Sequence, residues 1–238
     1  MAYDFTAATS HYLQWGTGFN GRTFSAAAWV NPRGTTSTGY VFSGMFDGTN
    51  GWFVRRDTTD PAKWACGLGG FDSILGVGTV TADTWQHMVL TIDNAAADML
   101  LYHNNSLIGS NTSINPLWIE GTGNFGVGNR DDLARDWEGG ICDAALWIDY
   151  NLTADQRAML ALGYSPFFIN PRPTWYAPLV GNISDLIGAK TATNTNATPT
   201  VAHPRIYFPA PGLSFDRADD VAAGGGTNVW RTLMGVGG

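Results

Sequence analysis

Short apolar stretches that end at turn residues dominate the first 149 residues of the chain. Segments such as 24–30 and 85–93 stop at Gly, Asn, Asp or Pro, and the next apolar stretch follows after a few residues. This spacing is typical of the strands of a β-sandwich. His103-Asn104-Asn105-Ser106 is a predicted hairpin turn, because Asn tolerates left-handed backbone conformations. The other candidate strands are 40–45, 52–56, 63–68, 99–103, 106–109, 124–128 and 140–148.

One segment carries the signals of a helix. Thr153 can cap its N-terminus, and Gln156, three residues later, completes a capping box. Ala, Met and Leu fill the segment up to Leu162, and Gly163 stands where a helix usually ends. A helix this short is expected to cover a sandwich, not to form a domain.

Composition limits the partners of the chain. Charged residues make up 14% of the sequence, and the net charge is −7, so a phosphate backbone would be repelled. The adjacent basic residues Arg55 and Arg56 lie in a strand-like stretch and form no basic patch. No apolar run approaches the roughly 20 residues needed to cross a bilayer, and the first thirty residues do not resemble a secretory signal. We expect neither a nucleic-acid partner nor a membrane partner. Cys66 and Cys142 are either two buried thiols or one disulfide.

Three segments resemble the laminin-G-like, concanavalin-A-like jelly-roll family in matching order. They are Tyr3-Asp-Phe with 24–30, Thr84-Trp-Gln-His-Met-Val-Leu-Thr-Ile-Asp93 with its hairpin 100–109, and Gly140-Ile-Cys-Asp-Ala-Ala-Leu-Trp147 with Leu152-Thr-Ala-Asp-Gln. The resemblance covers residues 2–165. It implies an all-β fold with two antiparallel sheets, and often a sugar or calcium site on one rim. It also implies that Trp29, Trp85 and Trp147 are core residues.

Residues 166–238 form a predicted extension, rich in Pro, Gly, Thr and Asn, that packs on the sandwich or on neighbouring subunits. Residues 191–200 have no apolar period and suggest a surface loop or a linker. Residues 163–204 resemble an extension of jelly-roll proteins predicted from bacteriophage genomes. Near the C-terminus, Trp230, Leu233 and Met234 follow a glycine run, and we expect them to be buried in an assembly. The alternative is a tail that folds back on its own sandwich.

The sequence predicts no catalytic residues. Retaining glycosidases of this fold need two carboxylates about 5–5.5 Å apart, whereas Glu120 and Glu138 are not on alternating positions of one strand. Asp143 has no carboxylate two residues to either side. The four histidines lie in unrelated contexts. His87 shares a strand face with Trp85 by alternation, so a hydrogen-bonded core histidine is expected there.

A calcium site is the one metal site to consider, since calcium takes six to eight oxygen ligands. The candidate ligands lie in the loop before 140–147, the last strand segment that resembles the family. They are Asn129, Asp131, Asp132 and Asp136. The arginines between them dilute the negative charge and favour the alternative of a solvated, ion-paired loop. A second acidic rim is a weaker candidate for a calcium site. It consists of Asp47, Asn50, Asp57 and Asp60.

Sugar binding needs exposed aromatic rings beside polar side chains. The tryptophans near loops are the candidates for this role: Trp52, Trp64, Trp118 and Trp137. Each can instead be a packing residue, in its own core or against a neighbouring subunit.

Two functions of different classes follow. The first is a non-enzymatic structural protein of a bacteriophage virion, a capsid decoration or tail-associated subunit, which docks on other virion proteins and on itself in the host cytoplasm. The alternative is a carbohydrate-binding, lectin-like module that recognises glycans. No cofactor is expected beyond the calcium considered above.

Overall fold

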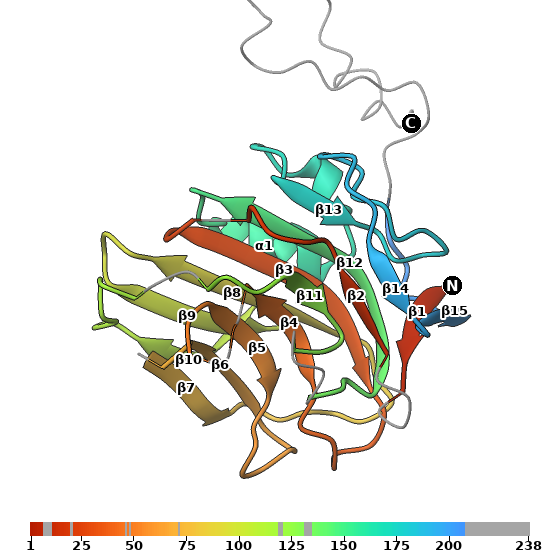
Figure 1. Cartoon of the computed structure of the whole chain (residues 1–238), viewed down its shortest axis with the longest axis horizontal. Helices are drawn as coiled ribbons and strands as arrows, with labels where there is room; N and C mark the ends of the chain where they lie inside the picture. Colours follow the sequence, from red (N-terminus) through yellow and green to blue (C-terminus); the bar gives the residue numbers. More distant parts are fainter. Residues whose placement is uncertain are drawn as a thin grey trace, which may run out of the picture. The chain divides into compact units, whose positions relative to one another are not determined.

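Two antiparallel sheets lie face to face in the computed structural model (Figure 1). The structure describes residues 1–6, 11–19, 21–45, 47, 49–70, 72–118, 121–130 and 135–207, with the side chain of Thr200 excepted. We call the two sheets sheet A and sheet B. Together they confirm the predicted all-β sandwich with one short α-helix.

Sheet A contains the longest strands. Its order is β10 (Ser106–Asn111), β9 (Asp98–His103), β8 (Gln86–Asp93), β3 (Phe24–Pro32), β12 (Gly139–Ile148), β1 (Ala2–Phe5) and β15 (Thr198–Val201), with β13 (Trp175–Ala177) also paired to β12.

Sheet B has seven strands. Its order is β14 (Thr193–Thr195), β2 (Tyr12–Gln14), β11 (Phe125–Val127), β4 (Tyr40–Gly44), β5 (Trp52–Arg56), β6 (Trp64–Leu68) and β7 (Asp72–Val77). Alternation along β5 shows which way the side chains point, because neighbouring residues of a strand face opposite sides. Trp52 and Val54 belong to the main core between the sheets, whereas Phe53 belongs to a separate small cluster with Tyr40 on the outer face.

Helix α1 (Ala154–Ala161) begins as predicted, with a capping box. The Thr153 hydroxyl accepts the Gln156 backbone N–H at 3.3 Å, and Gln156 Oε1 accepts the Thr153 N–H at 2.8 Å. The helix lies on the side of sheet A that faces away from sheet B (Figure 1). A second apolar cluster forms there from Ala27, Val89, Tyr102, Ala145, Trp147, Leu152, Leu160, Ile169 and Tyr176. The outer face of sheet A is therefore buried.

Residues 166–207 are part of the sandwich. After the 3₁₀ turn η2 (Pro166–Phe168), this segment supplies β13 and β15 to sheet A and β14 to sheet B. The loop or linker expected at 191–200 is thus largely two strands, which obtain their hydrogen bonds from β2 and β1. Residues 1–208 form one compact unit. Trp230, Leu233 and Met234 lie outside the described residues.

Two of the three predicted core tryptophans are only partly buried. Trp147 is 1% exposed, as expected, but Trp29 and Trp85 are half-buried. The Trp85 indole N–H donates to the Ala202 carbonyl at 2.9 Å. Its ring lies over Gly140, where an added Cβ would come within 2.9 Å of it. Trp85 therefore lies under the C-terminal segment and outside the centre of the sandwich.

Cys66 and Cys142 are free, buried thiols in different sheets, and burial raises the pKa of both. This finding confirms the thiol alternative. Within the described residues, no helix is long and apolar enough to cross a membrane.

Candidate functional site

The four tryptophans predicted to stack on sugars are all buried. Trp52 is 3% exposed, and Trp64, Trp118 and Trp137 are fully buried. The rings of Trp64 and Trp137 stack with centroids 6.2 Å apart, and Trp52 fills the space beside Gly44. All four rings belong to the main core cluster, so no ring face is left for a sugar. The interpretation of these residues as stacking platforms is corrected to the packing alternative.

The described part of the proposed calcium loop is bonded to itself. Asn129 is buried, and its Oδ1 accepts the backbone N–H groups of Arg130 and Arg135 at 2.7 and 3.0 Å. Its side-chain amide donates to Asp136 Oδ1. Asp131 and Asp132 lie outside the described residues. The described residues contain no group of three His, Cys, Asp or Glu side chains that could hold a metal. Asn129 and Asp136 are therefore bonded within the loop, and the calcium site stays a prediction.

The second acidic rim is divided between the two ends of β5. Asp47, before the strand, accepts the backbone N–H groups of Thr49 and Asn50, and the bond from Asn50 is the largest cause that lowers the pKa of Asp47 to about 2. Asp57, after the strand, accepts the backbone N–H groups of Thr59, Asp60 and Gly76. Both carboxylates therefore organise turns and do not share a site.

Asp143 and His87 are buried and do not form a catalytic pair. Asp143 lies at a bulge of β12 with φ 53° and accepts the Tyr176 hydroxyl at 2.5 Å. Burial raises its pKa to about 7, and the bond from Tyr176 opposes this shift. His87 packs 5.2 Å from Trp29, and burial lowers its pKa to about 3, with His103 adding to the shift. His87 is a core residue, as expected. Its Nδ1, however, has no hydrogen-bond partner in the described structure.

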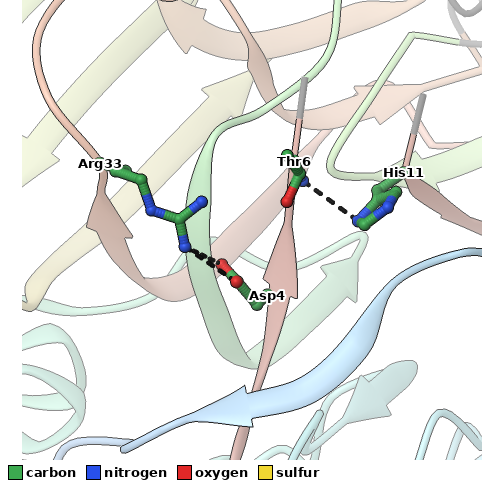
Figure 2. A network of polar contacts seen from close by, with 4 residues as sticks. All are labelled: Asp4, Thr6, His11 and Arg33. Atoms are coloured by element: carbon green, nitrogen blue, oxygen red, sulfur yellow. Dashed lines mark hydrogen bonds and ion pairs between the residues drawn. The ribbon is translucent and has the colours of Figure 1, made fainter. Parts of the chain in front are cut away.

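Polar contacts hold the N-terminal strand at one rim (Figure 2). Arg33, just after β3, donates Nη2 to both oxygens of Asp4 at 2.8 Å. The Thr6 backbone N–H donates to His11 Nδ1 at 3.1 Å. The Arg33 side chain is 45% exposed, and the two partners satisfy each other. These contacts therefore fix β1 at this rim.

The outer face of sheet B is the other broad face of the sandwich, and its central strands β11, β4, β5 and β6 are buried. No described helix covers it (Figure 1), in contrast to the outer face of sheet A. The strand registers place one row of residues directly across this face, which we call the outer row: Gln14, Gly126, Ser43, Phe53 and Gly67. Residues opposite each other in antiparallel strands share a face. The outer row therefore combines small residues with one aromatic ring.

Beside this row, Arg55 lies with Tyr40 and Phe53 in what we call the outer-face cluster. Tyr40, Phe53 and Arg55 are 4%, 6% and 8% exposed. The guanidinium carbon of Arg55 is 5.0 Å from the centroid of the Phe53 ring and 5.8 Å from that of Tyr40. Both distances are within the range of cation–π attraction. This arrangement holds a positive charge against two aromatic rings on a sheet surface.

Charges of both signs act on this cluster, from Tyr40 and Asp57 first and then from Arg135 and Arg130. The backbone N–H of Tyr40 donates to the Arg135 carbonyl at 3.2 Å, and Arg135 Nη1 donates to the Thr38 hydroxyl at 3.4 Å. Burial is the largest cause that lowers the pKa of Arg55. The charges of Arg135 and Arg130 act in the same direction, while Tyr40 and Asp57 oppose them. This cluster is not predictable from local sequence; the charged pair Arg55-Arg56 within a strand-like stretch is the signal that points to it.

These features define a two-sheet β-sandwich with a helix over one outer sheet face. Residues 7–156 match the family described as the concanavalin A-like lectin/glucanases superfamily. This match spans more than half of the chain, and the protein belongs to that superfamily. No curated protein sequence matches the chain.

Solved structures support the same fold. A candidate carbohydrate binding protein from Bacteroides ovatus aligns with a TM-score of 0.64 at 18% identity, over 83% of this chain and 58% of that one. A heptameric SAP-like pentraxin from Limulus polyphemus aligns with a TM-score of 0.54 at 17% identity, over 81% of this chain and 90% of that one. The chain thus spans little more than half of the Bacteroides protein. Identities this low show the fold alone.

Proposed function

We propose that the protein is a non-enzymatic, lectin-like module that binds carbohydrate on the outer face of sheet B. The observation that carries this proposal is the difference between the two outer faces. The outer face of sheet A is closed by α1 and its apolar cluster, whereas no described helix lies on the outer face of sheet B (Figure 1). Membership in a superfamily of lectins and glucanases supports a glycan as the ligand.

The described carboxylates favour binding over hydrolysis. A retaining glycosidase needs two carboxyl groups about 5–5.5 Å apart in one cleft. The buried carboxylate on β12, Asp143, has a tyrosine as its partner. Asp47 and Asp57 are both bonded to backbone N–H groups. None of these groups is arranged to protonate a glycosidic oxygen.

Gly126 provides a direct test of this face. A Cβ at Gly126 would meet its nearest atoms at 3.5 and 3.6 Å, which is ordinary van der Waals contact. The backbone therefore accepts a Cβ at this buried position, and Gly126→Leu should place an apolar side chain across the outer row; its denaturant midpoint, measured beside wild type, shows whether the variant folds. Ser110→Leu is the matched control, because Ser110 is exposed on β10, the outermost strand of sheet A.

The measurement is binding of a panel of neutral and acidic oligosaccharides by calorimetry. Wild type and Ser110→Leu should bind the same sugars, and Gly126→Leu should lose them. Sugar binding that Gly126→Leu leaves intact would place the site elsewhere. Absence of binding across the panel would contradict the lectin proposal.

A second candidate function is a structural protein of a bacteriophage virion, either a capsid decoration or a tail-associated subunit that docks on itself and on other virion proteins. The resemblance of residues 163–204 to extensions of phage jelly-roll proteins favours it. Truncation after Pro211 tests the proposed assembly role of Trp230, Leu233 and Met234. The truncated chain should keep its stability as a monomer but lose incorporation into particles or oligomers. A truncated chain that assembles normally would contradict this role.

A further inference from the structure

We propose that Tyr164 and Tyr207 form a second carbohydrate site, at which a neutral sugar ring stacks on their exposed aromatic surface. We call these two residues the tyrosine pair. The inference goes beyond the proposed function, because the pair lies at the C-terminal end of α1 and shares no residue with the outer row of sheet B. It depends on three observations: the exposure of the two rings, the bonds that hold them together, and the polar groups beside them.

The first observation is the exposure of the rings. Tyr164 and Tyr207 are 37% and 40% exposed, and they are the two most exposed aromatic side chains in the described part of the chain. Although they are far apart in the sequence, their ring centroids are 5.4 Å apart, with 30° between the ring planes. Leu162, close to Tyr164 in the chain, is 70% exposed. Exposed apolar side chains that gather in one place indicate a binding surface, whereas single ones do not.

The second observation is that backbone bonds hold the two rings together. The Tyr207 N–H donates to the Gly163 carbonyl at 2.7 Å, and the Ser165 N–H donates to the Tyr207 carbonyl at 2.9 Å. Gly163 has φ 90°, and an added Cβ would come within 2.4 Å of the Arg205 carbonyl oxygen, so this close approach requires glycine. The pair is therefore arranged before a ligand arrives, and binding costs less ordering of the chain.

The third observation is the set of polar groups beside the rings. Arg205 is exposed, and its guanidinium carbon lies 4.7 Å from the centroid of the Tyr207 ring. A guanidinium carries five N–H donors, and each tyrosine hydroxyl can donate and accept. Phe168 packs edge-on against Tyr164, with ring centroids 5.6 Å apart. The pair thus combines accessible aromatic surface with hydrogen-bonding groups, as sugar binding requires.

The chemistry favours a neutral sugar. The C–H bonds of a pyranose ring carry a partial positive charge and are attracted to the negative face of an aromatic ring. A nucleobase can also stack on such a ring, but the phosphates of a nucleic acid would be repelled by a chain with a net charge of −7. Membership in a superfamily of lectins and glucanases supports a sugar as the ligand.

Binding at this open surface should be weak. A pocket buries most of a small ligand, whereas a flat surface buries only one side of it. We therefore expect a dissociation constant of about 1 mM. Saturation-transfer NMR detects ligands of this affinity, whereas the calorimetric test of the outer face of sheet B measures tighter binding.

The test is saturation-transfer NMR on the full chain with cellotetraose, β-1,4-galactotetraose and mannotetraose. At least one of these sugars should receive saturation from the wild type through its ring C–H protons. Tyr164→Ser and Tyr207→Ser each remove one ring, and each should raise the dissociation constant about fivefold or more. Tyr207→Phe keeps the ring and should bind like the wild type.

Leu107→Ser is the matched control, because it removes an exposed apolar side chain from β10, at the edge of sheet A. It should bind like the wild type. All these variants change exposed side chains, so their denaturant midpoints should stay close to that of the wild type.

The outcomes separate this inference from the proposed function. Saturation transfer that Gly126→Leu removes and both serine variants keep would overturn the inference and leave the lectin proposal intact. Transfer that Gly126→Leu keeps and the serine variants lose, without any calorimetric binding, would support the inference and contradict the site on sheet B.

Three other results would also overturn the inference. The first is a wild type that transfers saturation to none of the sugars. The second is a loss in Tyr207→Phe as large as that in Tyr207→Ser, which would show that the ring does not carry the binding. The third is a serine variant that keeps sugar binding but changes its sedimentation coefficient, which would assign the tyrosine pair to a contact between copies of the chain.

Discussion

Replacing Asp143 by asparagine should stabilise the protein at neutral and alkaline pH and leave its stability in acid unchanged. Asp143 is 4% exposed and accepts the Tyr176 hydroxyl. Asparagine has nearly the same size and keeps an acceptor for Tyr176. It also tolerates the left-handed backbone at this position, where φ is 53°. The substitution therefore removes little except the charge.

The magnitude follows from the shifted pKa. Burial raises the pKa of Asp143 from 3.8 to about 7 in the folded state. Between these values the unfolded chain releases a proton that the folded chain keeps, so stability decreases as pH rises. At about 1.36 kcal/mol per pH unit, this loss amounts to about 4 kcal/mol at pH 7 and above. Below about pH 4 both states are protonated, and the loss disappears.

Denaturant unfolding of wild type and Asp143→Asn at several pH values between 4 and 8 tests this reasoning. The two proteins should have similar stability near pH 4, and the variant should gain about 4 kcal/mol by pH 8. Asp149→Asn is a matched control, because Asp149 also has a positive φ, 57°, but is exposed. A constant difference between wild type and Asp143→Asn at all pH values, or a variant that is less stable at pH 8, would refute the argument.

Three further predictions concern single residues. His87 has a folded pKa of about 3, below its ordinary 6.5. As pH falls below 6.5, the unfolded chain takes up a proton that the folded chain does not, so the wild type loses about 1.4 kcal/mol of stability per pH unit. His87→Phe should not show this loss when its unfolding free energy is measured between pH 6.5 and pH 4. Thr153→Ala should cost about 0.5–2 kcal/mol by breaking the capping box with Gln156, and an unchanged denaturant midpoint would contradict this role. Trp137→Ala should lower the free energy of unfolding by about 3–5 kcal/mol, because Trp137 is fully buried. Trp85→Ala should lower it by clearly less, because Trp85 is half-buried. Equal losses in urea unfolding would show that burial does not decide the cost.

The parts of the fold that depend on neighbouring residues could be predicted from the sequence. Thr153 and Gln156 lie within one helical turn, so the capping box is visible in the sequence and is present in the structure. The Asn104-Asn105 turn is likewise local, and both residues have positive φ. The resemblance over residues 2–165 led to the correct fold class because the order of strands is a property of the linear chain.

The candidate site could not be predicted, because its members come from strands far apart in the sequence. Trp64 and Trp137 look alike as loop-flanking aromatics, yet both rings face the core. Phe53 and Arg55 face outward on the same strand that turns Trp52 inward. No local pattern distinguishes these orientations, because the direction of each side chain depends on which strand pairs with which and in what register.

The sequence by itself determined most of the strand segments and the single capped helix, whereas the thiol state of Cys66 and Cys142 was decided only in the structure. The strands and the helix depend on the local conformational preferences of a few consecutive residues. The tertiary structure decided which sheet face α1 covers, how Arg55 meets Tyr40 and Phe53, and that Asp143 is buried against Tyr176. The burial and the electrostatic environment of a side chain are fixed only when distant segments pack together. Both depend on all the groups around that side chain, including groups far away in the sequence.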